Sequence, residues 1–245
     1  MGRFLPQTEP AARKRRRAAR IIERLRERYR QVRVPLRHRD PFQLLVSTIL
    51  SAQCTDAMVN RVTPVLFARY RTPDEFAKAR PGDIERVVKP TGFFRQKTKA
   101  ILGMSRSLME RFGGRVPLTM GELVTLEGVG RKTANVLLSA KRLEPWGGGD
   151  DPNDGLGFVV DTHVRRLSQR LGLATFDDPV KIEQQLMALV PREEWDGLSL
   201  RLIYFGREVC TARRPDCPHC PLRQLCPSAP YLGTPPWMRR RREGR

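Results

Sequence analysis

The stretch LEGVGRKTA, residues 126–134, holds a glycine turn between two segments with helical patterning. Before it, residues 119–122 (TMGE) have the capping-box pattern that opens a short helix. After it, a second helix is expected from Arg131 to about Arg142. Glycine lets a backbone approach a ligand closely, and the N–H groups that begin a helix favour an anion. The stretch therefore predicts two helices joined by a turn that is either a phosphate clamp or a simple connection.

Working outward from this turn, helical spacing of apolar residues recurs along most of the chain. Helices are expected over 18–30, 42–50, 97–112 and 193–207, and after Thr55, Pro73, Pro81, Asp161 and Asp178. No convincing strand pattern and no long internal repeat is found. The sequence predicts an all-α fold.

The composition is strongly basic. Lys and Arg number 46 against 26 Asp and Glu, which gives a net charge of +20. Solubility alone needs a magnitude of only about 2–8, and such an excess of positive charge favours polyanionic partners. We therefore expect a nucleic-acid partner and binding that weakens steeply with salt.

Two further features bear on location. No apolar run reaches the roughly 18 residues that a membrane helix needs, and the N-terminus has no apolar stretch of the signal-peptide kind. We expect a protein that does not bind membranes and is not secreted, in a reducing compartment, which in a prokaryote is the cytoplasm with its nucleoid.

Four of the five cysteines, Cys210, Cys217, Cys220 and Cys226, are separated by six, two and five residues. Four thiolates at this density suit tetrahedral zinc or a cubane iron–sulfur cluster, and the chemistry alone leaves both open. His219 lies between two of them, so a mixed-ligand zinc site is a further alternative. Cys54 stands apart and is interpreted as a small buried apolar residue.

Taken together, the motifs resemble those of one protein family. Residues 126–134 resemble the hairpin of the helix-hairpin-helix DNA glycosylase superfamily, and VDTHV at 160–164 resembles its catalytic aspartate segment. The cysteine spacing is similar to the cluster loop of the endonuclease III branch, and SAQCTD at 51–56 resembles a further segment of that branch. The resemblance covers about residues 42–226, in the family's order.

The resemblance implies a [4Fe–4S] cluster held by the four cysteines. It also implies two helical lobes with a DNA-binding cleft between them: a six-helix barrel with the helix-hairpin-helix over 34–144, and a cluster lobe built from 17–33 and 145–228. Outside them we expect a mobile basic extension over 1–16 and a basic tail over 229–245.

For function, the resemblance implies a monomeric bifunctional DNA glycosylase and AP lyase of base excision repair. Its partner is double-stranded DNA with damaged bases or abasic sites, and oxidised pyrimidines are the expected lesions. Lys132 matches the nucleophile that forms a Schiff base, and Asp161 matches its carboxylate partner. Without the resemblance, a phosphate ligand would be the usual interpretation of Lys132, and Asp161 also has a plain interpretation as a helix N-cap. The positive end of the helix disfavours an ammonium at Lys132, and a neutral amine is the form that attacks carbon.

Other residues match family positions that contact DNA. Gln53 matches a glutamine that enters the gap left by the flipped nucleotide. Phe93 lies in a segment similar to a wedge loop, and core packing is its plain alternative. Arg213 and Arg214 are candidates for phosphate contact or for a solvated surface. Gly128, Gly130 and Arg131 complete the expected DNA-binding set.

The chain also departs from the family pattern. The segment 146–157 is longer than expected, and Glu127 places a carboxylate in the hairpin. Three other hypotheses are a monofunctional adenine glycosylase of the same superfamily, a damage-recognition protein without catalysis, and a zinc-stabilised DNA-binding module. The first would usually lack Lys132, the second would bind without strand cleavage, and the third would be colourless.

Overall fold

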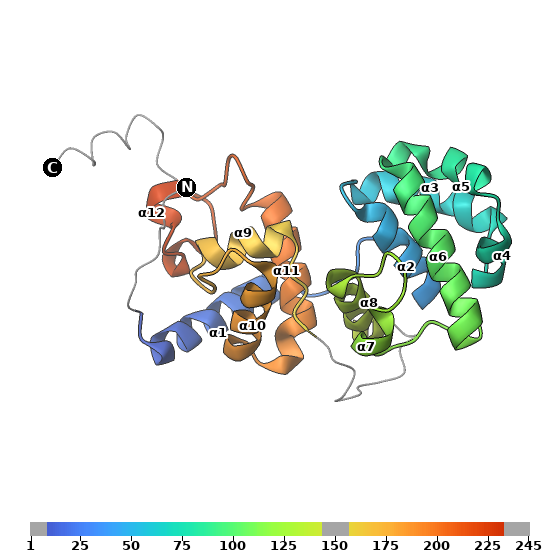
Figure 1. The fold of residues 1–245 in the computed structure, drawn as a ribbon. Coiled ribbons are helices and arrows are strands. Elements are labelled where there is room, and N and C mark those ends of the chain that lie inside the picture. The colour runs from blue at the N-terminus through green and yellow to red at the C-terminus, as the bar shows by residue number, and fades with distance from the viewer. Residues whose placement is uncertain (1–8, 144–156, 233–245) are drawn as a thin grey trace. The chain divides into compact units, whose positions relative to one another are not determined.

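The computed structural model describes residues 9–143 and 157–232. Within these ranges every regular element is a helix, with twelve α-helices and three 3-10 turns, so the predicted all-α fold is confirmed. The chain divides into two compact units, Met1–Val32 with Gly157–Arg245, and Arg33–Leu156, whose helices are labelled in Figure 1. Among the helices described, none is long and apolar enough to span a membrane.

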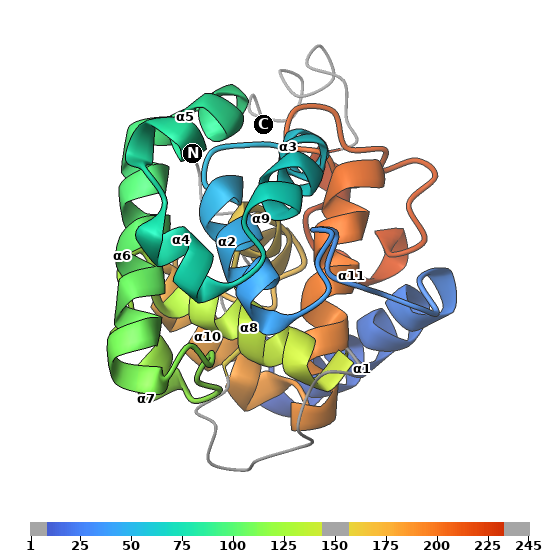
Figure 2. The same ribbon diagram turned by 90° about the vertical axis from the view of Figure 1, so that its right-hand side faces the viewer.

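The unit Arg33–Leu156 is a continuous stretch of chain. Its elements are α2 (Pro41–Ser51), α3 (Asp56–Arg69), α4 (Pro73–Lys78), α5 (Pro81–Val88), the 3-10 turn η1 (Lys89–Thr91), α6 (Phe94–Phe112), α7 (Met120–Leu123) and α8 (Arg131–Leu143). Helix α2 contacts α3, α6 and α8, and Figure 2 shows the helices of this unit gathered around it.

Helix α2 is buried on most sides, as its apolar run predicts. Leu44, Leu45 and Val46 are fully buried, and each large apolar side chain removed from water contributes about 1.5–3 kcal/mol. The helix begins where the Asp40 carboxylate accepts a 2.8 Å hydrogen bond from the Gln43 N–H. It ends at Ser51, which places the SAQCTD segment at its C-terminal end.

Proline and capping residues define several helix starts. Helices α4, α5 and α10 (Pro179–Leu189) each have proline in the first turn, where the missing N–H costs no hydrogen bond. Thr72 and Asp178 cap α4 and α10 through their side-chain oxygens. These starts are confirmed as predicted.

The second unit joins the start of the chain to its C-terminal part. It contains α1 (Ala11–Arg28), α9 (Thr162–Arg170), α10, the turn η2 (Arg192–Glu194), α11 (Trp195–Glu208), the turn η3 (Arg223–Leu225) and α12 (Ala229–Leu232). Helix α11 contacts both α1 and α9. The core between them includes Leu25, Phe158, Leu167, Leu198 and Phe205, all exposed by no more than 1%.

The first helix begins earlier than the sequence predicts, at Ala11 instead of Ala18. The expected mobile extension over 1–16 is therefore corrected: residues 11–16 are helical. The reason is Arg17, whose guanidinium pairs with Glu9 at 2.7 Å and also donates to the carbonyls of Leu171 and Leu225. These contacts attach a stretch with little apolar patterning to the rest of the unit.

Three other features of the sequence lie wholly or largely outside the described residues. They are the N-terminal residues 1–8, the insertion at 146–157 except Gly157, and the basic tail from residue 233 onward. Of the tail expected over 229–245, the structure describes only the short helix α12.

Candidate functional site

The turn between α7 and α8 has the geometry that its glycines predict. Gly128 has φ of 76°, and a Cβ there would lie 2.6 Å from the Cβ of Ala100 on α6, so only glycine fits. Leu126 and Val129 are buried and anchor the turn, whereas Gly130 is exposed. The turn thus holds the N-terminal end of α8 at the surface, where its first N–H groups can bind an anion.

Lys132 is the second residue of α8 and is exposed. Arg131 beside it is exposed as well. The Lys132 amine thus follows directly after a backbone turn suited to an anion.

Asp161 is the N-cap of α9. Its Oδ1 accepts a 2.7 Å hydrogen bond from the Val164 N–H, so the cap occupies one of its two carboxylate oxygens. Two sequence-predicted residues therefore have clear positions, Lys132 on α8 of one unit and Asp161 at the start of α9 in the other.

His163, in the first turn of α9, is a structural neighbour of Asp161. Burial lowers the pKa of His163, and the charge of Asp161 opposes that shift. Its Nδ1 lies 3.1 Å from the Arg166 guanidinium, which donates to the carbonyls of Gly206 and Cys210. The imidazole is consequently neutral near pH 7 and serves the local hydrogen-bond network.

The four clustered cysteines line one hollow of the second unit, together with Arg170 and Phe205 among others. Burial is the main cause that raises the pKa of Cys217, Cys220 and Cys226, the last to about 11, and neighbouring cysteine charges add to the effect. Four thiolates facing one hollow would repel one another, so this donor set fits a positively charged centre.

The four cysteines share a hollow, and zinc or an iron–sulfur cluster would each use such sulfurs as ligands. In the part of the chain that the structure describes, no three His, Cys, Asp or Glu side chains converge closely enough to hold one metal ion. His219 does not line the hollow, and its Nδ1 instead lies 2.9 Å from Asp216.

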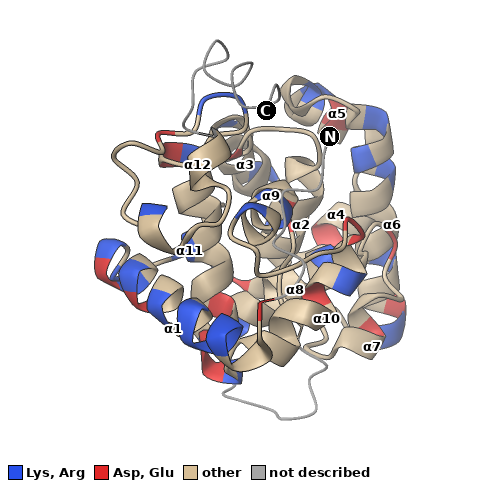
Figure 3. Cartoon of the chain, turned by 90° about the vertical axis from the view of Figure 1, so that its left-hand side faces the viewer, with Lys and Arg blue, Asp and Glu red and all other residues tan. Residues whose placement is uncertain are grey.

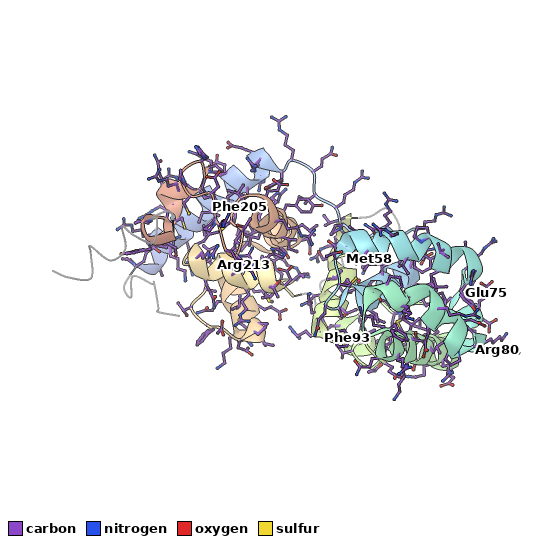
Figure 4. All side chains as sticks on the ribbon, turned by 90° about the horizontal axis from the view of Figure 1, so that it is seen from above. Met58, Glu75, Arg80, Phe93, Phe205 and Arg213 are labelled. Atoms are coloured by element: carbon purple, nitrogen blue, oxygen red, sulfur yellow. The ribbon has the colours of Figure 1, made fainter. Side chains whose placement is uncertain are left out.

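Helix α9 braces the loop that begins at Cys210. The Arg170 guanidinium donates to the Cys210 sulfur at 3.4 Å, to the Thr211 carbonyl at 2.8 Å and to the Ala212 carbonyl at 2.9 Å. The next two residues, Arg213 and Arg214, are exposed, and Arg213 is labelled in Figure 4. The loop thus presents two arginines from a fixed backbone.

Gln53 and Phe93 both lie in the other unit, on exposed turns. Their φ angles are 51° and 46°, and among the described residues they are the two non-glycine residues with positive φ. The Phe93 ring is 59% exposed, so it is not packed in the core. Figure 4 shows Phe93 and Met58 towards one end of this unit, with Glu75 and Arg80 at the other.

A basic surface also follows helix α1. Figure 3 shows Lys and Arg along successive turns of this helix. Exposed arginines at 13, 15, 16, 20 and 24 face away from the buried Ile21 and Leu25. Such a row attracts a polyanion at low salt.

Sequence reasoning missed the residues that hold these loops. Arg166 and Arg170 donate to main-chain carbonyls of the cysteine loop, and Lys97 is buried against the carbonyls of Leu50 in α2 and Thr91 in η1. The sequence did contain a signal for the burial of Lys97, because this residue lies four positions before the buried Ile101 on the core face of α6.

Comparison with known proteins identifies the class. Residues 46–192 match the model of the HhH-GPD superfamily base excision DNA repair protein. Endonuclease III of Synechocystis sp. is 48% identical over 89% of this chain and 95% of its own length. Endonuclease III of Bacillus subtilis is 41% identical over 84% of this chain and 89% of its own length.

Solved structures agree with these matches. A trapped endonuclease III–DNA covalent intermediate is 37% identical, with a TM-score of 0.80 over 90% of this chain and 99% of its own. The chain belongs to the endonuclease III family of the HhH-GPD superfamily.

Proposed function

We propose that this chain is a bifunctional DNA glycosylase and AP lyase of base excision repair. The observation that carries the proposal is the exposed Lys132 at the second position of α8, directly after a glycine turn suited to phosphate. The covalent endonuclease III–DNA intermediate among its relatives supports it. The substrate is double-stranded DNA with damaged bases, oxidised pyrimidines above all, or with abasic sites.

Lys132 supplies the nucleophile. The target nucleotide leaves the base stack, and the neutral amine of Lys132 attacks its C1′ as the bond to the base breaks. The sugar ring then opens and the amine becomes a Schiff base. This iminium acidifies the C2′ hydrogen; its loss is followed by departure of the 3′ phosphate with the electrons of the C3′–O bond, which is β-elimination.

Asp161 supplies the carboxylate. Positive charge develops on the sugar as the base departs, and a carboxylate nearby stabilises it. The same group can take the proton that the lysine loses on attack. Because the N-cap bond uses Oδ1, capping and catalysis are compatible.

The remaining sites bind and distort the duplex. The backbone of Gly128 and Gly130 with Arg131 holds a phosphate, and Arg213 and Arg214 contact the backbone elsewhere. Gln53 fills the gap left by the extruded nucleotide, and the exposed Phe93 ring separates stacked bases.

Cys210, Cys217, Cys220 and Cys226 hold a [4Fe–4S] cluster, supported by the shared hollow and the thiol pKa values. When bound, the cluster would supply a positively charged centre that offsets the mutual repulsion of the four thiolates. The chain's own part is to fix the loop that carries Arg213 and Arg214 through the contacts of Arg170.

The test is strand cleavage of a duplex with one abasic site, with and without borohydride. The proposal predicts nicking on the 3′ side and a covalent adduct in borohydride, and Lys132→Gln loses both, whereas Lys99→Gln, exposed on α6 of the same unit, keeps them. Binding without nicking by the wild type would instead support a damage-recognition protein. Excision of a base without nicking of the resulting site would support a monofunctional glycosylase.

A further inference from the structure

Lys97 is a buried cation, with only 5% of the residue exposed. Its Nζ donates two hydrogen bonds to main-chain carbonyls, 2.8 Å to Leu50 and 2.7 Å to Thr91. A buried ammonium is retained only where such partners compensate its lost hydration. The Leu50 carbonyl belongs to α2 and the Thr91 carbonyl to η1, so one amine connects two separate elements of the unit.

Each of the two carbonyls lies just before a strained residue. Leu50 is in the last turn of α2, three residues before Gln53, and Thr91 ends η1, two residues before Phe93. Gln53 and Phe93 are the two non-glycine residues with positive φ in the described ranges. Such conformations persist only where the surroundings impose them.

Lys97 also holds the Phe93 loop, residues 92–93 between η1 and α6, at a second point. Its own backbone N–H donates to the Phe93 carbonyl at 3.1 Å, while its side chain holds Thr91 on the other side of Gly92. Thr91 is itself buried, and its hydroxyl donates to the Val88 carbonyl at 2.8 Å. The loop is therefore fixed at both ends, while Phe93 itself is exposed.

The contact with α2 has an electrostatic component too. The last carbonyls of a helix have no intrahelical partner and carry partial negative charge, which favours a cation. The Lys97 ammonium supplies both the donor and the charge for Leu50. An apolar side chain in its place would leave two buried carbonyls without their donor, one in α2 and one in η1.

We infer that Lys97 is a positioning residue that couples the Gln53 loop (residues 52–55, between α2 and α3) to the Phe93 loop. Both loops then enter the duplex together, already in their final conformation. The inference rests on the proposed function, in which these two residues fill and widen the gap at the extruded nucleotide. Lys97 is buried and touches no DNA; it acts through the two loops.

The test uses a duplex with a non-cleavable abasic analogue and 2-aminopurine beside it, whose fluorescence rises when the neighbouring stack opens. Lys97→Met removes the hydrogen-bond donors of the ammonium and keeps a side chain of similar length. Lys97→Gln keeps some of these donors in its amide group. At saturating protein we expect Lys97→Met to lose most of the fluorescence rise, and single-turnover adduct formation on a natural abasic site to slow about tenfold. Lys97→Gln should lie between it and the wild type.

Lys99→Met is the matched control, because Lys99 is exposed on the same helix and its loss changes the net charge equally. It should stay within about twofold of the wild type. Melting followed by circular dichroism identifies a temperature at which each variant is folded, and the comparison is made there. Wild-type fluorescence and rate in Lys97→Met would overturn the inference.

A double-mutant cycle with Phe93→Ala separates positioning from general destabilisation. If Lys97 acts through the loop, Lys97→Met should slow the reaction by no more than about twofold once the ring is gone. Effects that multiply fully would overturn the inference. The fluorescence measurement needs no covalent step. If the wild type forms no borohydride adduct, the proposed lyase activity is refuted, but the fluorescence still tests the role of Lys97 in the two loops.

Discussion

Asp161 accepts a 2.7 Å hydrogen bond from the Val164 N–H, which makes the proposed catalytic carboxylate the N-cap of α9 as well. The cap and the proposed chemistry can be separated by substitution. Asparagine caps a helix about as well as aspartate, but it carries no charge and accepts no proton.

We therefore predict that Asp161→Asn changes the free energy of unfolding by less than about 0.5 kcal/mol. Its rate of borohydride-trapped adduct formation should fall about 100-fold or more. Asp178, which caps α10 through a 2.9 Å bond from the Lys181 N–H, gives the matched control. An equal loss of rate in Asp178→Asn, or none in Asp161→Asn, would remove the catalytic role of Asp161.

A second prediction concerns Phe93, whose backbone has φ of 46°. A non-glycine residue there costs on the order of 1 kcal/mol, which glycine would avoid. Phe93→Gly should therefore leave the protein at least as stable as the wild type while slowing adduct formation about tenfold through loss of the wedge.

Phe93→Ala provides the comparison, since it removes the ring but keeps the strained backbone. Denaturant unfolding and single-turnover kinetics measure the two quantities. A stable Phe93→Gly variant with full activity would show that the ring has no part in opening the stack.

A third prediction concerns the cysteine site. Cys217→Ser removes one of four sulfurs around the hollow, so the protein should lose its brown colour. Affinity for duplex DNA should fall about tenfold with it, because Arg213 and Arg214 lie on the loop between Cys210 and Cys217. Cys54→Ser, in the other unit, should keep both the colour and the affinity. A colourless Cys217→Ser protein with undiminished binding would separate the cluster from DNA contact.

A fourth prediction concerns pH. The hydrogen bond from Arg17 holds the pKa of Glu9 below its ordinary value of 4.5. A carboxyl with a lowered pKa stabilises the fold above its unfolded pKa, and this contribution disappears as the pH falls through the folded value. Glu9→Gln should thus cost roughly 0.5–1 kcal/mol at pH 7. Wild type and variant should converge in unfolding free energy below pH 4.5; a difference that stays constant down to pH 3 would exclude this ion pair as its source.

The sequence was informative where local chemistry sets the backbone. Proline in the first turn marks α4, α5 and α10 correctly, and Gly128 marks a turn that only glycine can make. The start of α1 was missed, because its stability comes from Arg17 reaching carbonyls about 150 residues or more away in the chain. The helical spacing of apolar residues is a local pattern, so it cannot predict such long-range contacts.

The site also combines features set by local sequence with features that depend on long-range contacts. The cysteine spacing predicts a shared site, and the four side chains line one hollow. Neither Gln53 nor Phe93 is a residue type that favours positive φ strongly, so their conformations depend on neighbours such as Lys97. The pairing of Lys132 with Asp161 came from the family resemblance, since no local rule links a helix start to an N-cap about 30 residues away.

The most direct test of the central claim is to identify the residue that becomes attached to the sugar. The wild-type protein is mixed with a duplex that carries one abasic site, and borohydride reduces the Schiff base. The protein is then digested, and the peptide that carries the deoxyribose remnant is sequenced by mass spectrometry. We expect the remnant on Lys132. A remnant on another amine, such as Lys99 or the chain terminus, would contradict it.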